Sequence, residues 1–157
     1  MPKRGLFIVF EGLDGAGTST QLYKLAEQIE GLNKYQDILK THEPWRSEEI
    51  KRRLAEDGDA YSDGLEFARL YVGDRTDHTH QLIGPNLKAG CVVLCDRYSL
   101  STCTYQWTQG VPLEDLVQMH KDRGILIPDL TFFIDIKPKT ARKRITLRGS
   151  SLDKFEK

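Results

Sequence analysis

The first residues that could do chemistry lie in the stretch EGLDGAGTST, residues 11–20, directly after the apolar run LFIVF. The spacing follows the phosphate-loop pattern G-x-x-x-x-G-K-[ST], with Ser19 as the hydroxyl residue and Thr18 where the pattern has lysine. Glycines let backbone N–H groups turn inward around an anion, and the following helix adds its partial positive charge. We therefore predict phosphate binding by this set: Gly12, Gly15, Ala16, Gly17, Thr18, Ser19 and Thr20.

A second chemical group follows the apolar run CVVLC, where Asp96 and Arg97 are neighbours. A strand that ends in a carboxylate is a common source of a second acidic group directed at Mg²⁺ in phosphoryl-transfer proteins. Arg97 could hold a phosphate through two parallel hydrogen bonds. The plainer alternative is that Asp96 caps a helix or pairs with Arg97. Because the glycine loop is also present, we favour the functional interpretation. We predict that Asp96 and Arg97 are catalytic and that Ser19 and Asp96 hold the metal.

Tyr71, Arg75 and His78 are spaced so that they share one face of a helix. A ring and a guanidinium on one stripe could stack on a base and hold its polar edge or its phosphate. The alternative is a half-buried tyrosine beside a solvated arginine. Near the end of the chain, Arg144 and Arg148 belong to a run of cations. That run is either a solvated face or a mobile lid that brings positive charge to a transferred group.

The elements that must position these residues alternate between strands and helices. Apolar runs predict strands at 6–10, 37–41, 91–95 and 130–136. Helical spacing predicts helices at 22–31, 47–58 with Ser47 as N-cap, 65–88, 99–107, 113–123 and 137–149. This order predicts an α/β fold, a doubly wound parallel sheet with helices on both faces. Ligands bind such sheets beyond the carboxyl ends of the strands, where the glycine loop, HEPWR and DRYS all lie.

Composition narrows the classes of protein further. The 157 residues fit a single domain, and 23 basic residues balance 23 acidic ones. Because nucleic-acid binders usually carry a basic surplus, we expect no nucleic-acid partner. No apolar run approaches the roughly 20 residues of a membrane span, and the N-terminal run is too short for a signal peptide. Cys91, Cys95 and Cys103 form no C-x-x-C pair, and Cys91 and Cys95 lie in an apolar segment. This favours buried free thiols over metal ligands, and a reducing cytoplasm.

The motifs together resemble the thymidylate kinase family, a group of P-loop nucleoside monophosphate kinases. FEGLDGAGTSTQ resembles the family's FEG-[IL]-DGAGKSTQ, HEPW its REPGG-type loop, and FARLYVGDRTDH its LLFAADRAEH. VVLCDRYSLSTCTYQ is similar to VVISDRYIDSSLAYQG, and IPDLTFFIDIKPKTARKRI to LPDLTLLLDVPPEVALERI. RGSSLDKFEK resembles the lid, RG-x-x-DRFE. The matches run in order through nearly all of 1–157, which we interpret as a single P-loop kinase domain whose lid begins at about 148.

The resemblance implies a P-loop NTPase type of fold, ATP-dependent phosphorylation of dTMP to dTDP, Mg²⁺ as cofactor, and a homodimer. It implies that Tyr71 stacks on thymine, that Arg75 contacts the base or phosphate, and that Arg97 holds the acceptor phosphate. The other implied roles are Asp14 as acceptor for the sugar 3′-hydroxyl, Tyr105 and Gln106 as walls of the nucleoside pocket, and Arg144 and Arg148 as lid cations.

The chain departs from the family pattern in three places. Thr18 replaces the loop lysine, which implies either an enzyme of reduced activity or one in which a lid arginine, Arg144 or Arg148, supplies the missing charge; we expect the latter. His42 replaces an arginine, and Trp45 and Arg46 replace glycines; Arg46 could take over a contact to the dTMP phosphate. The sequence also stops inside the lid, so we expect the family's last strand and terminal helix to be missing from it. Two alternatives stay open: a catalytically impaired nucleotide-binding pseudo-kinase, and a kinase of another nucleoside monophosphate or of a deoxynucleoside.

Overall fold

A parallel sheet forms the centre of the molecule. Its strands are β1 (Phe7–Gly12), β2 (Ile38–His42), β3 (Val92–Asp96) and β4 (Leu130–Ile134), in the order β2-β3-β1-β4. The structure is a computed structural model and describes residues 4–55 and 62–148. Each strand lies on a predicted apolar run, within two residues at either end. The sheet grows from β1 in both directions, so the strand order reverses at β1, as in doubly wound folds.

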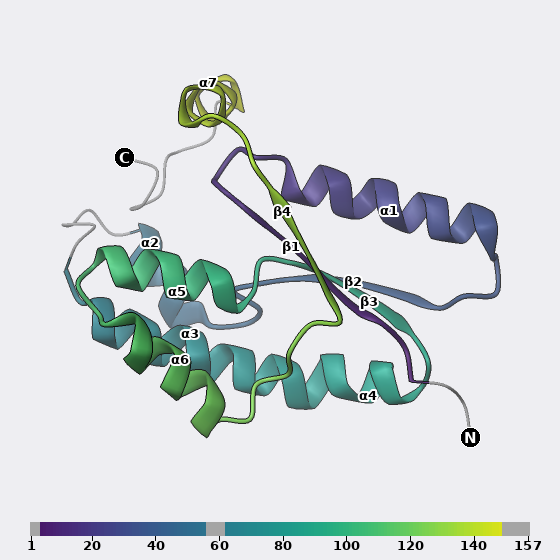
Figure 1. Cartoon of the computed structure of the whole chain (residues 1–157), viewed down its shortest axis with the longest axis horizontal. Coiled ribbons are helices and arrows are strands. Elements are labelled where there is room, and N and C mark those ends of the chain that lie inside the picture. Colours follow the sequence, from purple (N-terminus) through teal and green to yellow (C-terminus); the bar gives the residue numbers. More distant parts are fainter. Residues whose placement is uncertain (1–3, 56–61, 149–157) are drawn as a thin grey trace.

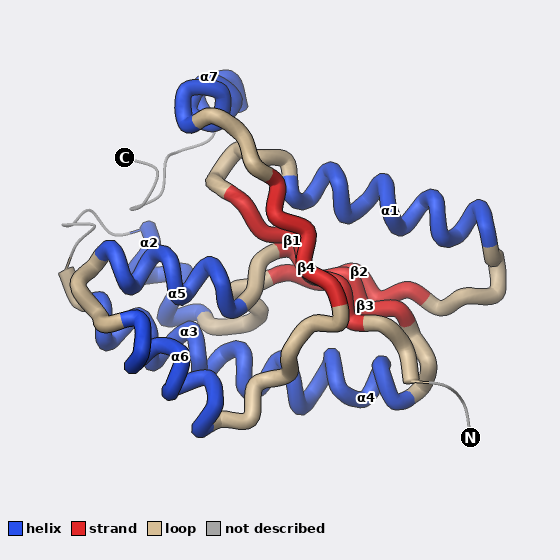
Figure 2. The backbone as a smooth tube through the Cα atoms, viewed as in Figure 1, coloured by secondary structure: helices blue, strands red, loops and turns tan. Residues whose placement is uncertain are grey.

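Helices cover both faces of the sheet (Figure 1). One face is covered by α1 (Thr18–Leu32), because Ile8 and Phe10 of β1 pack against its residues Leu22 and Ala26. On the opposite face, the strand residues Phe7, Val9, Val93 and Cys95 pack against Ile83 and Leu87. A second group of helices lies on this side of the sheet (Figure 2). That group comprises α3 (Gly64–His78), α4 (Gly84–Lys88), α5 (Ser99–Thr108) and α6 (Leu113–Asp122). The period-two alternation of apolar side chains therefore explains the three layers.

The helical pattern predicted over 65–88 is confirmed, with one irregularity. Between α3 and α4 lies a π-helical turn, η1 (Thr79–Ile83). There the Gly84 N–H donates to the Thr79 carbonyl, five residues back. Pro85 has no N–H and its ring crowds the preceding turn, which explains why the helical hydrogen-bond pattern changes from four to five residues at this place. A Cβ on Gly84 would lie 2.9 Å from the Thr79 carbonyl oxygen, so glycine fits the tight turn.

The two remaining helices are α2 (Glu48–Ala55) and α7 (Pro138–Arg148). The predicted cap of α2 is confirmed, because the Ile50 N–H donates to Ser47 Oγ at 3.2 Å. The rest of this predicted helix, 56–58, and the predicted lid beyond 148 lie outside the described residues. None of the described helices is both long and apolar enough to cross a membrane. Cys91, Cys95 and Cys103 are free thiols, the first two of them buried.

Candidate nucleotide-binding site

The glycine loop joins β1 to α1 at the carboxyl edge of the sheet. Gly15 and Gly17 have φ angles of 79° and 96°, in the left-handed region that favours glycine. Gly17 directly precedes the first residue of α1, Thr18, whose side chain is buried. The loop therefore lies at the N-terminus of a 15-residue helix, an arrangement that can attract an anion.

Helix α7 lies against this loop. A Cβ on Gly15 would come within 2.7 Å of the Ala141 carbonyl oxygen, so α7 approaches too closely for any other residue. Arg144 Nη1 donates to the Ala16 carbonyl at 3.0 Å and to the Gly15 carbonyl at 3.4 Å. Within the described ranges, no carboxylate lies within ion-pairing distance of Arg144. The guanidinium thus brings uncompensated positive charge to the edge of the loop.

Loop and helix enclose a cleft of about 510 Å³, here called the phosphate cleft. All residues predicted from Gly15 to Thr20 line it, together with the predicted Arg144 and Arg148. Gly12 lies just before the loop, at the end of β1. The other lining residues are Asp14, Gln21, Asp96, Arg97 and Ile145.

Ser19 and Asp96 meet on the floor of the phosphate cleft. The Ser19 hydroxyl donates to Asp96 Oδ2. The other carboxylate oxygen, Oδ1, is buried and has no hydrogen-bond partner among the described residues. Hydroxyl and carboxylate oxygens are the ligands that Mg²⁺ prefers, and the unpartnered Oδ1 leaves one free to coordinate. These two side chains therefore fit the predicted metal.

Arg97 connects the loop to a second pocket. It has a φ of 67°, and its Nη1 donates to the Gly12 carbonyl at 2.9 Å. Its Nη2 donates to Asp14 Oδ1 at 2.5 Å, and the Tyr105 hydroxyl donates to the other oxygen of Asp14. Asp14, Arg97 and Tyr105, which are far apart in the sequence, are thus joined at one point.

Glu11, which the sequence analysis missed, holds this segment in place. Its buried carboxylate accepts the backbone N–H of Tyr98 at 2.9 Å and the Ser101 hydroxyl at 2.6 Å. These bonds satisfy donors at the start of α5. The only signal in the sequence was a carboxylate inside an otherwise apolar strand.

The second pocket, here called the base pocket, has a volume of about 50 Å³. Tyr71, Arg75, Arg97, Tyr105 and Gln106 all line it, so the structure brings the predicted nucleoside residues together. Gln106 is 0% exposed, and its Nε2 donates to Gln109 Oε1 at 3.0 Å. Its amide oxygen Oε1 is buried with no partner among the described residues. A donor on a ligand would satisfy that oxygen.

Arg75 is the centre of a buried network behind the base pocket. Its side chain is 1% exposed, and its Nε donates to Glu43 Oε2 at 2.6 Å. Glu43 also accepts from His78 Nδ1 at 3.1 Å. The alternative of a solvated arginine is therefore wrong. Sequence reasoning missed Glu43 and His120, which also contacts Arg75, because their partners come from other helices and no spacing links them.

Arg46 is the predicted residue that lies apart from the others. Its guanidinium lies over the Trp45 ring, 4.2 Å from the centroid, and it lines neither the phosphate cleft nor the base pocket. Trp45 stacks on His78 with a centroid distance of 5.0 Å. The carboxylate of Asp74 accepts the backbone N–H groups of Trp45, Arg46 and Ser47, which fixes this turn on α3.

Comparisons of the sequence and of the structure with known proteins point to one and the same family. Residues 10–157 match the family model described as thymidylate kinase. A "Probable thymidylate kinase" from Pyrococcus horikoshii is 41% identical over 161 residues, covering 98% of this chain and 76% of that protein. A "Thymidylate kinase" from Ruegeria pomeroyi is 40% identical, covering 99% and 75%. The crystal structure of thymidylate kinase from Ehrlichia chaffeensis matches with a TM-score of 0.76 at 30% identity, covering 90% and 82%. This chain therefore belongs to the thymidylate kinase family.

Proposed function

We propose that this protein transfers the γ-phosphoryl group of ATP to the 5′-phosphate of dTMP, forming dTDP. The observation that carries the proposal is the meeting of two cavities at Arg97, which lines both the phosphate cleft and the base pocket. A phosphoryl donor in one and an acceptor in the other would be held with the reacting groups close together. Such positioning, with neutralisation of charge, is most of what phosphoryl transfer requires from a protein.

On the ATP side, the backbone amides of the loop would hold the phosphates. Ser19 and Asp96 would hold Mg²⁺, which when bound neutralises charge on the phosphate oxygens. In the family pattern a lysine follows Gly17; here Thr18 brings no charge. Arg144 is bonded to the loop itself, so we assign it the missing positive charge, with Arg148 as the second lid cation. Arg97 would hold the acceptor phosphate.

On the dTMP side, Gln106 supports thymine as the base. Thymine carries a hydrogen on N3, and the unpartnered Oε1 of Gln106 is an acceptor in the wall of the base pocket. Cytosine has no hydrogen at N3, so it would leave that oxygen unpaired. Tyr71 would stack on the ring, Arg75 would contact the base or the phosphate, and Asp14 would accept from the sugar 3′-hydroxyl. A nucleoside is larger than this pocket, so the lining side chains must separate to admit it.

Three further assignments belong to the proposal. Arg46, although it lies on Trp45, would reach the acceptor phosphate only after leaving that ring. The working protein would be a homodimer, as the family resemblance implies, and the free cysteines favour the cytoplasm. With equal numbers of basic and acidic residues, it would have no nucleic-acid partner.

The test is a coupled kinase assay with Mg-ATP and a panel of nucleoside monophosphates, run on the native protein and on Thr18→Lys. We expect dTMP to be the preferred acceptor and both proteins to turn over, because Arg144 already supplies charge at the loop. In the native background, Arg144→Met should lower kcat by roughly a hundred- to a thousandfold, as loss of a preorganised donor does in other enzymes. In the Thr18→Lys background the loss should be clearly smaller.

The matched control is Arg142→Met, an exposed arginine on the same helix, which should change kcat less than about twofold. A native protein that binds dTMP in calorimetry but makes no dTDP would refute the proposal and identify a pseudo-kinase. Equal losses from Arg144→Met in both backgrounds would refute the assignment of the missing charge to Arg144.

A further inference from the structure

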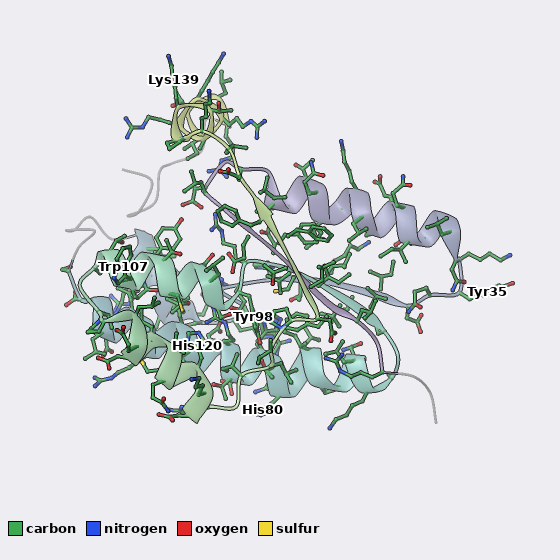
Figure 3. The ribbon with its side chains drawn as sticks, viewed as in Figure 1. Tyr35, His80, Tyr98, Trp107, His120 and Lys139 are labelled. Atoms are coloured by element: carbon green, nitrogen blue, oxygen red, sulfur yellow. The ribbon has the colours of Figure 1, made fainter. Side chains whose placement is uncertain are left out.

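A buried histidine outside both cavities contacts the arginine that lines the base pocket. His120 of α6 is 9% exposed, and its Nε2 lies 2.7 Å from Arg75 Nη1. Its Nδ1 lies 2.6 Å from the Leu116 carbonyl oxygen, one turn back on the same helix. Figure 3 labels His120 on α6 and the exposed His80 at the outer edge of the same layer of helices.

The two partners determine the protonation state of the ring. A carbonyl oxygen can only accept, so Nδ1 must carry the hydrogen. A guanidinium can only donate, so Nε2 must carry a lone pair. His120 is therefore neutral in this structure, in the Nδ1–H form. A proton on Nε2 would place two donors and two positive charges 2.7 Å apart.

The bond to His120 is part of what fixes the direction of Arg75. Thr102 Oγ1 accepts from Nη2 at 3.1 Å, and Glu43 accepts from Nε at 2.6 Å. Three elements thus hold one guanidinium: the loop after β2, α5 and α6. His120 is the one member of the set whose ability to accept depends on pH near neutrality.

We propose that His120 is a positioning residue, whose neutral ring orients Arg75 for the nucleoside and whose protonation weakens nucleoside binding. The inference rests on the proposed function, because it takes the base pocket as the place where the nucleoside binds. It adds a residue that touches no substrate and a pH dependence that the two cavities alone do not imply.

The charges around His120 determine the direction of the effect. Arg75 of α3 faces the ring directly, Glu43 lies behind Arg75, and Cys103 of α5 packs with Leu116 of α6. Burial lowers the pKa of His120 below its ordinary value of 6.5, and Arg75 lowers it further, while the bond to the Leu116 carbonyl and the charge of Glu43 act against this without reversing it. The neutral ring therefore persists at neutral pH and is lost as the pH falls through the lowered pKa.

The experiment measures the Kd of thymidine by calorimetry from about pH 8 down to about pH 5, the range in which histidines titrate. Thymidine is the probe because it has no phosphate that titrates in this range. For the native protein we expect a constant Kd at neutral pH and a rise of about tenfold or more at the acid end, as for a lost buried hydrogen bond. His120→Gln, which retains an acceptor but does not titrate, should show no rise. His120→Leu should bind about tenfold more weakly at every pH, because it leaves Arg75 Nη1 without this acceptor.

The matched control is His80→Gln, which removes an exposed titrating histidine and should keep the native profile. Identical pH profiles for the native protein and His120→Gln would overturn the inference, even if His120→Leu fails to fold. Native affinity in a folded His120→Leu protein would also overturn it. If thymidine binds with the expected profile but dTMP is not phosphorylated, the proposed function fails and the positioning role stands. If the native protein binds no thymidine, both fail.

Discussion

Among single residues, Asp14 and Arg97 have the most direct consequence for substrate binding. Asp14 accepts from Arg97 at one oxygen and from Tyr105 at the other, so one carboxylate joins the phosphate cleft to the wall of the base pocket. A sugar hydroxyl that bonds to Asp14 must share or displace one of these donors. Nucleoside binding would therefore change the surroundings of Arg97, the arginine that we propose for the acceptor phosphate.

Selection of the base can be tested at one residue. Gln106→Leu keeps most of the side-chain volume but removes the buried acceptor Oε1. Since an acceptor matched to N3–H favours thymine over cytosine, we expect kcat/KM for dTMP to fall about ten- to a hundredfold. The preference for dTMP over dCMP should shrink by a similar factor. Steady-state kinetics with both nucleotides measures this, and Gln118→Leu on the exposed face of α6 is the control. An unchanged preference would rule out Gln106 as the reader of N3.

Among the elements, α7 bears most directly on the phosphate loop. The helix packs on the loop through Gly15, where no side chain fits, and from there Arg144 reaches two loop carbonyls. The surface of α7 is largely polar, and Ala141 is its one buried residue among those described. The contact with the loop therefore depends on close backbone approach more than on apolar burial.

Gly15→Ala tests this contact. The added methyl would lie 2.7 Å from the Ala141 carbonyl oxygen, at a φ of 79° that alanine rarely adopts. We expect α7 to shift from the loop, Mg-ATP affinity to fall about tenfold, and unfolding free energy to drop by about 1–3 kcal/mol. Calorimetry and denaturant titration measure the two effects. In the control Gly31→Ala, the new methyl meets nothing within 4 Å; stability should rise by up to about 1 kcal/mol with ATP affinity unchanged. Native ATP affinity in Gly15→Ala would contradict the role given to α7.

The sequence predicts the strands, the order of elements and the glycine loop, because each depends on local spacing. Periodicity places Tyr71 and Arg75 on one face, but it does not say whether that face meets solvent. Arg75 is buried because Glu43, Thr102 and His120 arrive from three other segments, and such long-range pairing leaves no local pattern. Glu11 was overlooked for the same reason.

For the whole molecule, one carboxylate ties the first and last described strands together. Asp129 accepts the Phe7 N–H at 2.7 Å and pairs with Arg4, while its own N–H donates to the Phe7 carbonyl at 2.8 Å. The N-terminal segment and the segment entering β4 are thus fixed to each other across more than a hundred residues. A link of this kind stabilises the fold cooperatively, because it forms only when the sheet is complete.

The acid stability of the protein should report this link. The Phe7 N–H, with a smaller contribution from Arg4, holds the pKa of Asp129 below its ordinary value of 3.8. A lowered carboxyl pKa stabilises the folded state above the unfolded pKa, and the gain is lost as the pH falls through the folded pKa. Asp129→Asn should therefore have a lower free energy of unfolding than the native protein at pH 7. This difference between the two proteins should disappear below about pH 4. Denaturant titrations over this range measure it. The exposed control Asp77→Asn should not reproduce this pH dependence, and a constant difference for Asp129→Asn would contradict the assignment.

The π-helical turn at 79–83 has a consequence for the directions in which α3 and the helical segment after it face. Buried positions recur three or four residues apart along this whole stretch, as at Val72, Arg75, Thr79, Ile83 and Leu87. One additional residue turns the following face by about 100°, so Ile83 of η1 and Leu87 of α4 can pack on the sheet while Arg75 of α3 lines the base pocket. Removing one residue from the turn should therefore rotate the face that packs on the sheet out of register with the face that carries Arg75.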